Sequence, residues 1–269
     1  CDLVIASPGV REDAPIRNDL HQRGIPVISE LELAYQLCPY RLIAVTGTRG
    51  KRSTIELMQR IFARAGHCLT IGGNRGRPLS AILLDSALQS EPRAQATGGL
   101  QRAASFSSRD PVQSEPGAQA TGGLPITNRQ SPIVNPLIAL AVSSFQLESI
   151  VHFRPHIAAI LNIQEEHLDR HRSIAEYARI KSRIFMNHRP DDILILPYDD
   201  PRLRALARKH HGRTLFISAT QPLDRGAWLD NGQIFLNVDG TVETIDPWEG
   251  EAPAEPQSVP RPRGSGVGI

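Results

Sequence analysis

The 269-residue sequence predicts an α/β fold, with a mostly parallel sheet and helices on both of its faces. Apolar, strand-like runs alternate with segments of helical period, and Gly or Pro separates them, which is typical of βα units. A glycine-rich turn, "TGTRGK" at residues 46–51, directly follows one of these runs. Two shorter strand-like runs come before it. We therefore expect a P-loop-type central domain preceded by a partial Rossmann-like domain.

The individual elements follow from the local pattern of apolar residues. Short runs rich in Val, Ile, Leu and Ala predict buried strands at 2–7, 25–29, 41–47, 156–163, 192–197 and 214–218. Helical period predicts helices at 14–24, 30–38 and 173–185, and one after Lys51 with Leu57, Met58, Ile61 and Phe62 on one face. A hairpin is expected at 227–238, because Asn231-Gly232 favours a type I′ turn.

Two segments lack the composition of a folded core. Residues 86–132 are rich in Ser, Gln, Gly, Pro and Ala, and residues 90–100 recur there almost unchanged as 114–124. Residues 249–269 have almost no large apolar side chain. We predict that both segments are disordered. The expected organisation is the C-terminal part of an N-terminal domain at 1–38, a central domain at 39–248 interrupted by the insertion at 86–132, and a tail at 249–269.

Composition argues against several classes of protein. The chain has 30 basic and 28 acidic residues, a formal net charge of +2, so no preference for nucleic acid or for a membrane surface follows. Cys1, Cys38 and Cys68 have neither metal-site spacing nor the pattern of a disulfide framework. There is no signal peptide and no run of about 18 apolar residues. We expect a cytoplasmic monomer. Because the sequence begins without Met inside a strand-like run, we interpret it as a fragment.

The glycine-rich turn carries the clearest chemistry. Backbone N–H groups of a turn between a strand and a helix point inward, and the helix N-terminus adds partial positive charge, so both favour a polyphosphate. Lys51 would then reach the terminal phosphates. The formal G-x-x-x-x-G-K-[ST] pattern is not met, because Val45 stands at the position of its first glycine. An ordinary βα turn with an incidental lysine is the alternative.

A lysine interrupts the apolar stripe of the helix expected at 173–185. Ser173 and Glu176 have the S-x-x-E spacing of a capping box, which predicts where the helix begins. Lys181 then falls on the same face as Ile174 and Tyr177. Such a lysine either extends its amine along the apolar surface to solvent or is a buried group with a function. The pattern alone slightly favours the first reading.

Several motifs resemble one known family. The turn "TGTRGK" is similar to the T-G-T-N-G-K loop of the Mur ligases, the ATP-dependent enzymes that build the peptide of peptidoglycan precursors. Five further segments resemble the D-glutamate-adding branch and occur in the family's order between Asp2 and about Asp200. They are "SPGVREDAPIRNDLHQRGIPVISELELAYQL", "GGNRGRPLS", "SSFQLE", "LNIQEEHLDRH" and "ARIKSRIF". The resemblance identifies the chain as a member of this family.

The resemblance implies a reaction and its participants. ATP, with Mg²⁺, would phosphorylate the carboxylate of UDP-N-acetylmuramoyl-L-alanine, and the amine of D-glutamate would attack the resulting acyl phosphate. The loop residues would bind the nucleotide. They are Gly47, Thr48, Arg49, Gly50, Lys51, Arg52 and Ser53.

The resemblance also implies individual roles. Lys51, His167 and Lys181 would be catalytic, and His167 would hold magnesium together with a carbamate formed from Lys181 and CO₂. Burial would assist that modification, because it lowers the pKa of a lysine. Asn74 and Ser143 would contact the substrate. From the residues alone, Asn74 is nearly as well explained as a turn residue between glycines.

Two positions depart from the family pattern. Arg52 stands where the family has Ser or Thr after the phosphate-loop lysine, and Ala141 stands where it has an acidic residue two places before "SSFQLE". Both positions bind magnesium in the family, and Mg²⁺ requires oxygen ligands. The first half of the N-terminal domain and the C-terminal ligase domain are also missing from the sequence. We therefore expect this chain alone to be inactive or nearly so.

Two other functions remain open at this point. One is a non-catalytic remnant that binds nucleotide weakly. The other is a ligase similar to folylpolyglutamate synthase, which shares the phosphate loop and the carbamylated lysine; "SSFQLE" and "ELELAY" argue against it.

Overall fold

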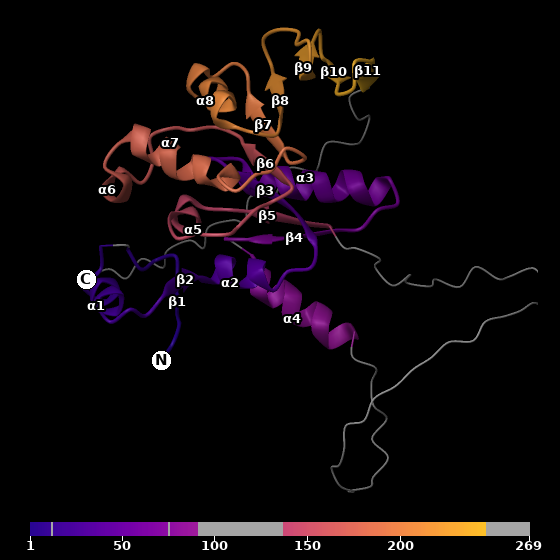
Figure 1. Ribbon diagram of the computed structural model, residues 1–269. Coiled ribbons are helices and arrows are strands. Elements are labelled where there is room, and N and C mark those ends of the chain that lie inside the picture. Colours follow the sequence, from indigo (N-terminus) through magenta and orange to yellow (C-terminus); the bar gives the residue numbers. More distant parts are fainter. Residues whose placement is uncertain (12, 75, 91–136, 246–269) are drawn as a thin grey trace, which may run out of the picture.

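The computed structural model describes residues 1–11, 13–74, 76–90 and 137–245. They form two sheets: a large one with helices on both faces, and a separate small one of two strands (Figure 1). The disorder expected at 249–269 and at most of 86–132 lies outside these residues. In the part of the chain that is described, no helix is long and apolar enough to cross a membrane.

Within the described ranges, the large sheet has nine strands in the order β11-β10-β9-β8-β7-β6-β3-β5-β4. All neighbours from β4 to β9 pair in parallel, and only β9, β10 and β11 pair antiparallel. The predicted mostly parallel α/β sheet is therefore confirmed. The strands are β3 (Arg41–Thr46), β4 (Leu69–Gly73), β5 (Leu137–Ala141), β6 (Ile157–Ile160), β7 (Ile193–Pro197), β8 (Arg213–Ser218), β9 (Gly226–Asp230), β10 (Gln233–Asn237) and β11 (Val242–Ile245).

Helices lie on both faces of this sheet, and the central strand β3 shows why. Leu42 and Ala44 on β3 point into one apolar cluster, whereas Ile43 and Val45 point into another, as alternation along a strand requires. The first cluster is covered by α2, α4, α5, α7 and α8, and the second by α3. The helices that follow β3 are α3 (Lys51–Arg64), α4 (Leu79–Ser90), α5 (Ser144–Glu148), α6 (Leu168–His171), α7 (Ile174–Ser182) and α8 (Pro201–Leu206).

Only half of the apolar face predicted for α3 contacts the sheet. Met58 and Phe62 pack against the second cluster. Leu57 and Ile61, predicted on the same face, are 50% and 57% exposed. Each precedes a packed residue by one position, which is about 100° around the helix, so the side chains of Leu57 and Ile61 lie on a neighbouring face that turns away from the sheet.

The first strands form a small unit of their own. β1 (Val4–Ala6) and β2 (Val27–Ser29) pair in parallel and are connected through α1 (Pro15–Gln22). α2 (Glu30–Gln36) begins directly after β2, where the hydroxyl of Ser29 accepts a hydrogen bond from the backbone N–H of Glu32. Leu31 of α2 belongs to the same apolar cluster as β3. α2 therefore joins the small unit to the core of the large sheet.

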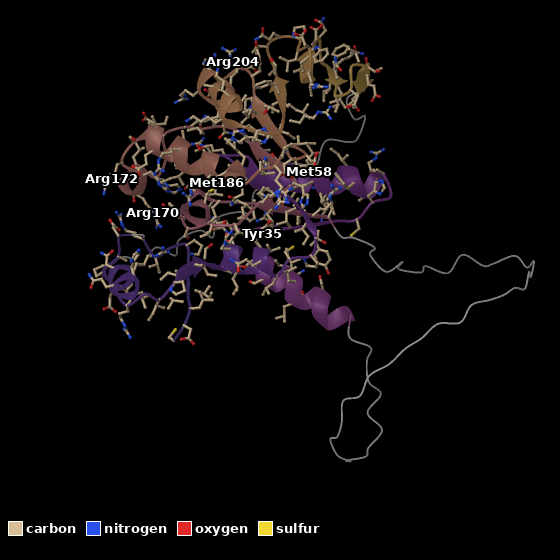
Figure 2. All side chains as sticks on the ribbon, in the orientation of Figure 1. Tyr35, Met58, Arg170, Arg172, Met186 and Arg204 are labelled. Atoms are coloured by element: carbon tan, nitrogen blue, oxygen red, sulfur yellow. The ribbon has the colours of Figure 1, made fainter. Side chains whose placement is uncertain are left out.

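Two charged side chains strengthen this junction. The carboxylate of Glu32, fully buried, accepts hydrogen bonds of 2.7–3.0 Å from the three backbone N–H groups of residues 151–153. Arg170 donates to the backbone carbonyls of residues 9 and 10 and to the carboxylate of Glu148, and it lies beside the N-terminal segment in Figure 2. A buried carboxylate is tolerated when donors surround it.

Several local predictions can be checked directly. The hairpin is confirmed, since β9 and β10 pair antiparallel around Asn231 and Gly232, whose φ angles of 47° and 80° fit a type I′ turn. The start of the insertion at 86 is wrong, because α4 continues to Ser90. The sequence Ala-Leu-Gln at 87–89 favours helix despite its low complexity. Strands β4 and β5 were not predicted, since one ends in two glycines and the other follows the repeat-rich segment.

Two histidines pack together beneath the start of β7 and β8. Nδ1 of His188 lies 2.8 Å from Nε2 of His210, and Nδ1 of His210 lies 3.0 Å from the hydroxyl of Thr214. Nε2 of His188 is buried and has no hydrogen-bond partner among the described residues. Burial, with a smaller contribution from His210, lowers the pKa of His188 to about 4. The folded chain therefore holds this ring neutral.

This pair makes stability depend on pH. Between pH 6.5 and 4 the unfolded chain protonates His188 and the folded chain does not, so the free energy of unfolding falls as pH falls. The full effect of a pKa lowered from 6.5 to about 4 is about 3 kcal/mol. We expect His188→Phe, which keeps a ring in the site, to lose less stability than the unsubstituted chain over this range. Urea unfolding at pH 7, 5.5 and 4.5 measures it; parallel curves for the two chains would contradict it.

Candidate active site

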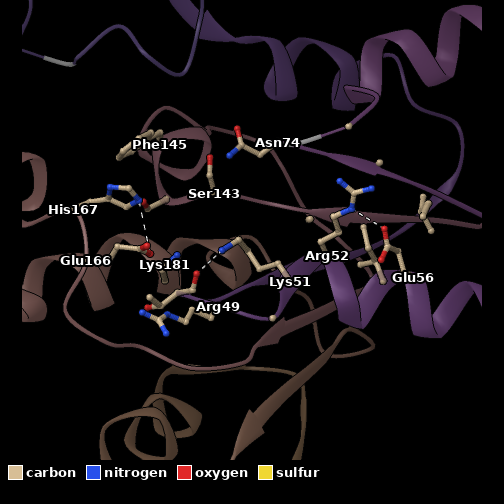
Figure 3. A pocket seen from close by; sticks show the side chains of 18 of the residues that line it. Arg49, Lys51, Arg52, Glu56, Asn74, Ser143, Phe145, Glu166, His167 and Lys181 are labelled. Atoms are coloured by element: carbon tan, nitrogen blue, oxygen red, sulfur yellow. Dashed lines mark hydrogen bonds and ion pairs between the residues drawn. The ribbon is translucent and has the colours of Figure 1, made fainter. Parts of the chain in front are cut away.

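A cleft of about 670 Å³ opens at the carboxyl ends of β3 and β5 (Figure 3). These neighbouring strands are followed by helices on opposite faces of the sheet, α3 and α5. Such a switch point leaves a crevice where α/β proteins place ligands. The lining residues are Thr48, Arg49, Gly50, Lys51, Arg52, Ile55, Glu56, Ile71, Gly72, Asn74, Gly76, Arg77, Ala141, Ser143, Ser144, Phe145, Glu166, His167, Tyr177 and Lys181.

The phosphate loop is fixed by bonds to the segment after β6. The backbone N–H of Arg49 donates to the side chain of Asn162, whose amide donates back to the carbonyl of Arg49. The hydroxyl of Thr48 bonds both backbone groups of Gln164. Gly50, with φ 83°, is the N-cap of α3 and makes no side-chain cap. The first N–H groups of α3 therefore face the cleft without a capping side chain, and no acidic residue occupies the first turn.

Two lysine ammonium groups converge on one backbone carbonyl. Nζ of Lys51 donates to the carbonyl oxygens of Gly47 and Thr48 at 2.7 and 2.8 Å. Nζ of Lys181 donates to the same Gly47 oxygen at 2.9 Å and to the hydroxyl of Thr46 at 3.4 Å. Since the bonds of 2.7 and 2.9 Å meet at one oxygen, the two ammonium groups are no more than 5.6 Å apart. An anion placed there would meet both charges.

Lys181 is buried, as expected if this lysine on the apolar stripe has a function and does not extend to solvent. It is 1% exposed, and its ammonium lies 4.5 Å from the ring centre of Tyr177. Burial, followed by repulsion from Lys51, lowers the pKa of Lys181 to about 7. The reading in which this lysine reaches solvent is therefore wrong. Tyr177, also 1% exposed, belongs to the site as well, and sequence reasoning had placed it only in the apolar core.

His167 stands at the opposite side of the cleft from Arg52 in the view of Figure 3, with Lys51 between them. Its φ of 56° is left-handed, a conformation that costs energy for a residue with a side chain and that clusters at functional sites. The ring lies 4.9 Å from that of Phe145, and Nε2 is 3.8 Å from the carboxylate of Glu166. Asn74 follows β4 and lines the cleft from another wall.

Ser143 has a structural task that sequence reasoning missed. Its hydroxyl accepts a hydrogen bond from the backbone N–H of Gln146, and the side-chain Oε1 of Gln146 accepts one from the backbone N–H of Ser143. This capping box starts α5 at the cleft edge. The S-x-x-Q spacing in the sequence was the available signal. The box expected at Ser173 is half formed, with its hydroxyl accepting from the N–H of Glu176.

The structure brings together nearly all the residues predicted for the site. The loop residues 48–52, with Asn74, Ser143, His167 and Lys181, line one cleft, and Gly47 contributes its carbonyl. Ser53 is the exception: it is exposed and outside the lining. Two residues after Lys51 correspond to about 200° around α3, so its side chain points away from the cleft. The roles of these residues in binding or catalysis stay predictions.

The donor groups of the cleft, as they stand, do not fit a magnesium ion. Mg²⁺ requires about six oxygen ligands. The carboxylate of Glu56 pairs with Arg52, and that of Glu166 faces His167. Ala141 offers a methyl group. No three His, Cys, Asp or Glu side chains within the described ranges are grouped to hold a metal. The predicted metal role of Lys181 depends on its carbamylation, since its ammonium only donates.

Comparison with known proteins finds relatives in one family. Residues 137–251 match the family model of the Mur ligase middle domain. UDP-N-acetylmuramoylalanine–D-glutamate ligase of Alkaliphilus oremlandii is 32% identical over 244 residues, which are 91% of this chain and 44% of the relative. The ligase of the same name from Pelotomaculum thermopropionicum is 34% identical over 245 residues, with the same coverage. The chain thus spans less than half the length of these curated relatives.

Solved structures show the same fold. A structure of UDP-N-acetylmuramoyl-L-alanyl-D-glutamate–2,6-diaminopimelate ligase has a TM-score of 0.50 and 16% identity, covering 91% of this chain and 52% of that one. At this identity the likeness concerns the fold alone.

Burial of Lys181 should cost stability at neutral pH. Between pH 7 and 10.5 the unfolded chain keeps this amine protonated while the folded chain releases the proton, so the free energy of unfolding rises with pH through that window. We expect Lys181→Met, of similar length and uncharged, to stabilise the chain at pH 7 by about 2–4 kcal/mol. The gain should shrink as pH rises to 10. Denaturant unfolding of both chains at pH 7 and 10 measures this, and a variant less stable at pH 7 would contradict it.

Proposed function

Because the chain belongs to the Mur ligase family, we propose that its cleft binds the phosphates of ATP for the ligation of D-glutamate to UDP-N-acetylmuramoyl-L-alanine. The observation that carries the proposal is the meeting of the α3 N-terminus with Lys51 and Lys181 at the end of β3. The likeness to curated ligases supplies the substrates. The reaction would belong to peptidoglycan precursor synthesis and would take place in the cytoplasm.

The proposed reaction has two steps. The terminal phosphoryl group of ATP passes to the carboxylate of UDP-N-acetylmuramoyl-L-alanine, giving an acyl phosphate and ADP. The amine of D-glutamate then attacks the acyl carbon, an amide bond forms, and inorganic phosphate leaves with loss of the amine's proton to solvent or a nearby base. Phosphoryl transfer depends on positioning and on neutralising charge.

Each loop group has its own task in the proposed binding. The N–H groups at the start of α3 and the loop backbone would donate to phosphate oxygens. Lys51 would exchange its bonds to the carbonyls of Gly47 and Thr48 for bonds to the terminal phosphates. Lys181, held behind it, brings a second amine to the same point, and an anion bound there would favour its protonated form. His167 and Asn74 lie on the walls where the acceptor carboxylate would approach, and Ser143 shapes the edge through its cap.

Magnesium would supply further charge neutralisation for transfer in this family, with His167 and a carbamylated Lys181 as its holders. In this chain the oxygen donors at two family positions are replaced by Arg52 and Ala141. This observation favours a second candidate, a remnant that binds nucleotide and transfers phosphate poorly. The two candidates share the binding site and differ in turnover.

Binding is tested by removing the loop lysine. We expect Lys51→Ala to weaken ATP binding by the 269-residue chain at least tenfold, because it removes one charge-assisted contact to phosphate. Lys209→Ala is the matched control, since Lys209 is exposed and outside the cleft lining. Calorimetric titration with ATP and Mg²⁺ measures both. Equal affinities for the two variants would refute the proposed site.

Turnover separates the two candidates. Phosphate release is followed with ATP and both acceptors, UDP-N-acetylmuramoyl-L-alanine (which accepts the phosphoryl group) and D-glutamate (which accepts the acyl group). The measurement is then repeated with each of these two compounds omitted. Release that requires both acceptors supports the ligase. Binding of ATP without any release that depends on UDP-N-acetylmuramoyl-L-alanine and D-glutamate supports the remnant.

A further inference from the structure

The charged side chains that line the cleft are predominantly basic. Positive side chains exceed carboxylates on its walls. The basic side chains are Arg49, Lys51, Arg52, Arg77 and Lys181, and the carboxylates are Glu56 and Glu166; Arg77 is also paired with Asp85, and a bound anion would favour the protonated form of Lys181. A cleft lined mainly by one sign of charge concentrates counter-ions of the other sign. The ligand that best matches these walls is itself strongly anionic and brings no cation.

Arg52 holds a position suited to a phosphate chain. It is the second residue of α3, next to Lys51, and its side chain lines the cleft while 71% exposed. A guanidinium presents several N–H donors in a plane and can bind two phosphate oxygens at once. In Figure 3 it lies on the far side of Lys51 from Lys181. The three cations therefore form a row along the phosphate loop.

We propose that the cleft binds a linear di- or triphosphate without a divalent cation, and that Arg52 provides charge that a metal ion would otherwise provide. This rests on the proposed function in one respect, since the same loop is taken to bind the phosphates of ATP. The geometry adds that the binding step does not need Mg²⁺. The N-terminus of α3 would not by itself support binding without Mg²⁺. The support comes from the row of basic side chains and from the poor fit of the cleft to a metal ion.

Glu56 opposes this binding and offers a handle for testing it. Its carboxylate lies 2.6 Å from Nε of Arg52, one turn along α3, and it lines the same cleft. A phosphate chain must compete with this carboxylate for the guanidinium. Removing the carboxylate charge should therefore strengthen metal-free binding, and removing the guanidinium should weaken it. A purely structural Arg52–Glu56 pair would give no such opposite pair of effects.

The experiment titrates inorganic triphosphate, and separately ATP, into the 269-residue chain by calorimetry, in EDTA and then in excess Mg²⁺. We expect measurable binding in EDTA. Arg52→Ser should weaken it about tenfold, the loss of one charge-assisted hydrogen bond. Glu56→Gln should tighten it up to about fivefold, because an exposed ion pair is worth up to about 1 kcal/mol. Arg60→Ser is the matched control: the same charge change on α3, exposed and outside the cleft lining.

The outcomes separate this inference from the proposed function. Binding of ATP only when Mg²⁺ is present would overturn metal-free binding and leave the proposed function standing. No binding of ATP under either condition would overturn both. Equal effects of Arg52→Ser and Arg60→Ser would show that general charge, and not Arg52, is responsible, and would overturn its assigned role. Thermal unfolding of each variant shows whether it is folded.

A double substitution provides the converse test. Arg52→Ser supplies a hydroxyl at the start of α3 and removes the guanidinium, and Ala141→Glu supplies a carboxylate at the end of β5. We expect this variant to bind triphosphate more weakly than the unsubstituted chain in EDTA and to recover affinity when Mg²⁺ is added. If the ratio of affinities with and without Mg²⁺ is the same in both chains, the assignment of Arg52 in place of a metal charge is wrong.

Discussion

The burial of β3 on both faces is the constraint from which the site follows. β5 and β6 pair with it on either side, and apolar clusters cover both of its faces. The position of the carboxyl end of β3 is therefore fixed by the sheet and by the core. The phosphate loop continues directly from that end, and Asn162 and Gln164 after β6 tie it down. The loop is therefore held by the sheet and not by its own few residues. A site that must present backbone N–H groups at fixed positions benefits from such support.

The amine of Lys181 is buried in the core, where an uncharged side chain would be more stable. Lys181 lies among buried side chains, and burial is the main reason that its pKa falls to about 7. Its remaining support is the carbonyl of Gly47, the hydroxyl of Thr46 and the ring of Tyr177. Structural needs alone would favour an apolar residue there. Proteins accept such a cost where the charge is used, and this agrees with a role for Lys181 in handling an anion or in its own modification.

The part of the chain before β3 depends on a few polar contacts for its position. Leu31 and Ala34 of α2 enter the main apolar cluster, but β1 and α1 have little buried surface of their own. Glu32 and Arg170 compensate, since each binds backbone groups of a distant segment. Arg170 also stacks over Phe145, which lines the cleft. The first unit and the cleft are thereby connected through one side chain.

The sequence by itself determined the α/β class, the hairpin and most of the residues that meet in the cleft, because these depend on local period, turn chemistry and motif order. It placed Lys181 on an apolar stripe but did not decide whether the amine reaches solvent or stays in the interior. A side chain of an isolated helix is not buried until the helix packs on the sheet. The S-x-x-Q spacing and the helical period were available signals for the cap at Ser143 and the orientation of Ser53, but nothing in the sequence indicated that Tyr177 lies next to the ammonium of Lys181. Those facts depend on how α3, α5 and α7 are oriented over β3 and β5. Only tertiary packing sets that orientation, because it brings together residues more than a hundred positions apart.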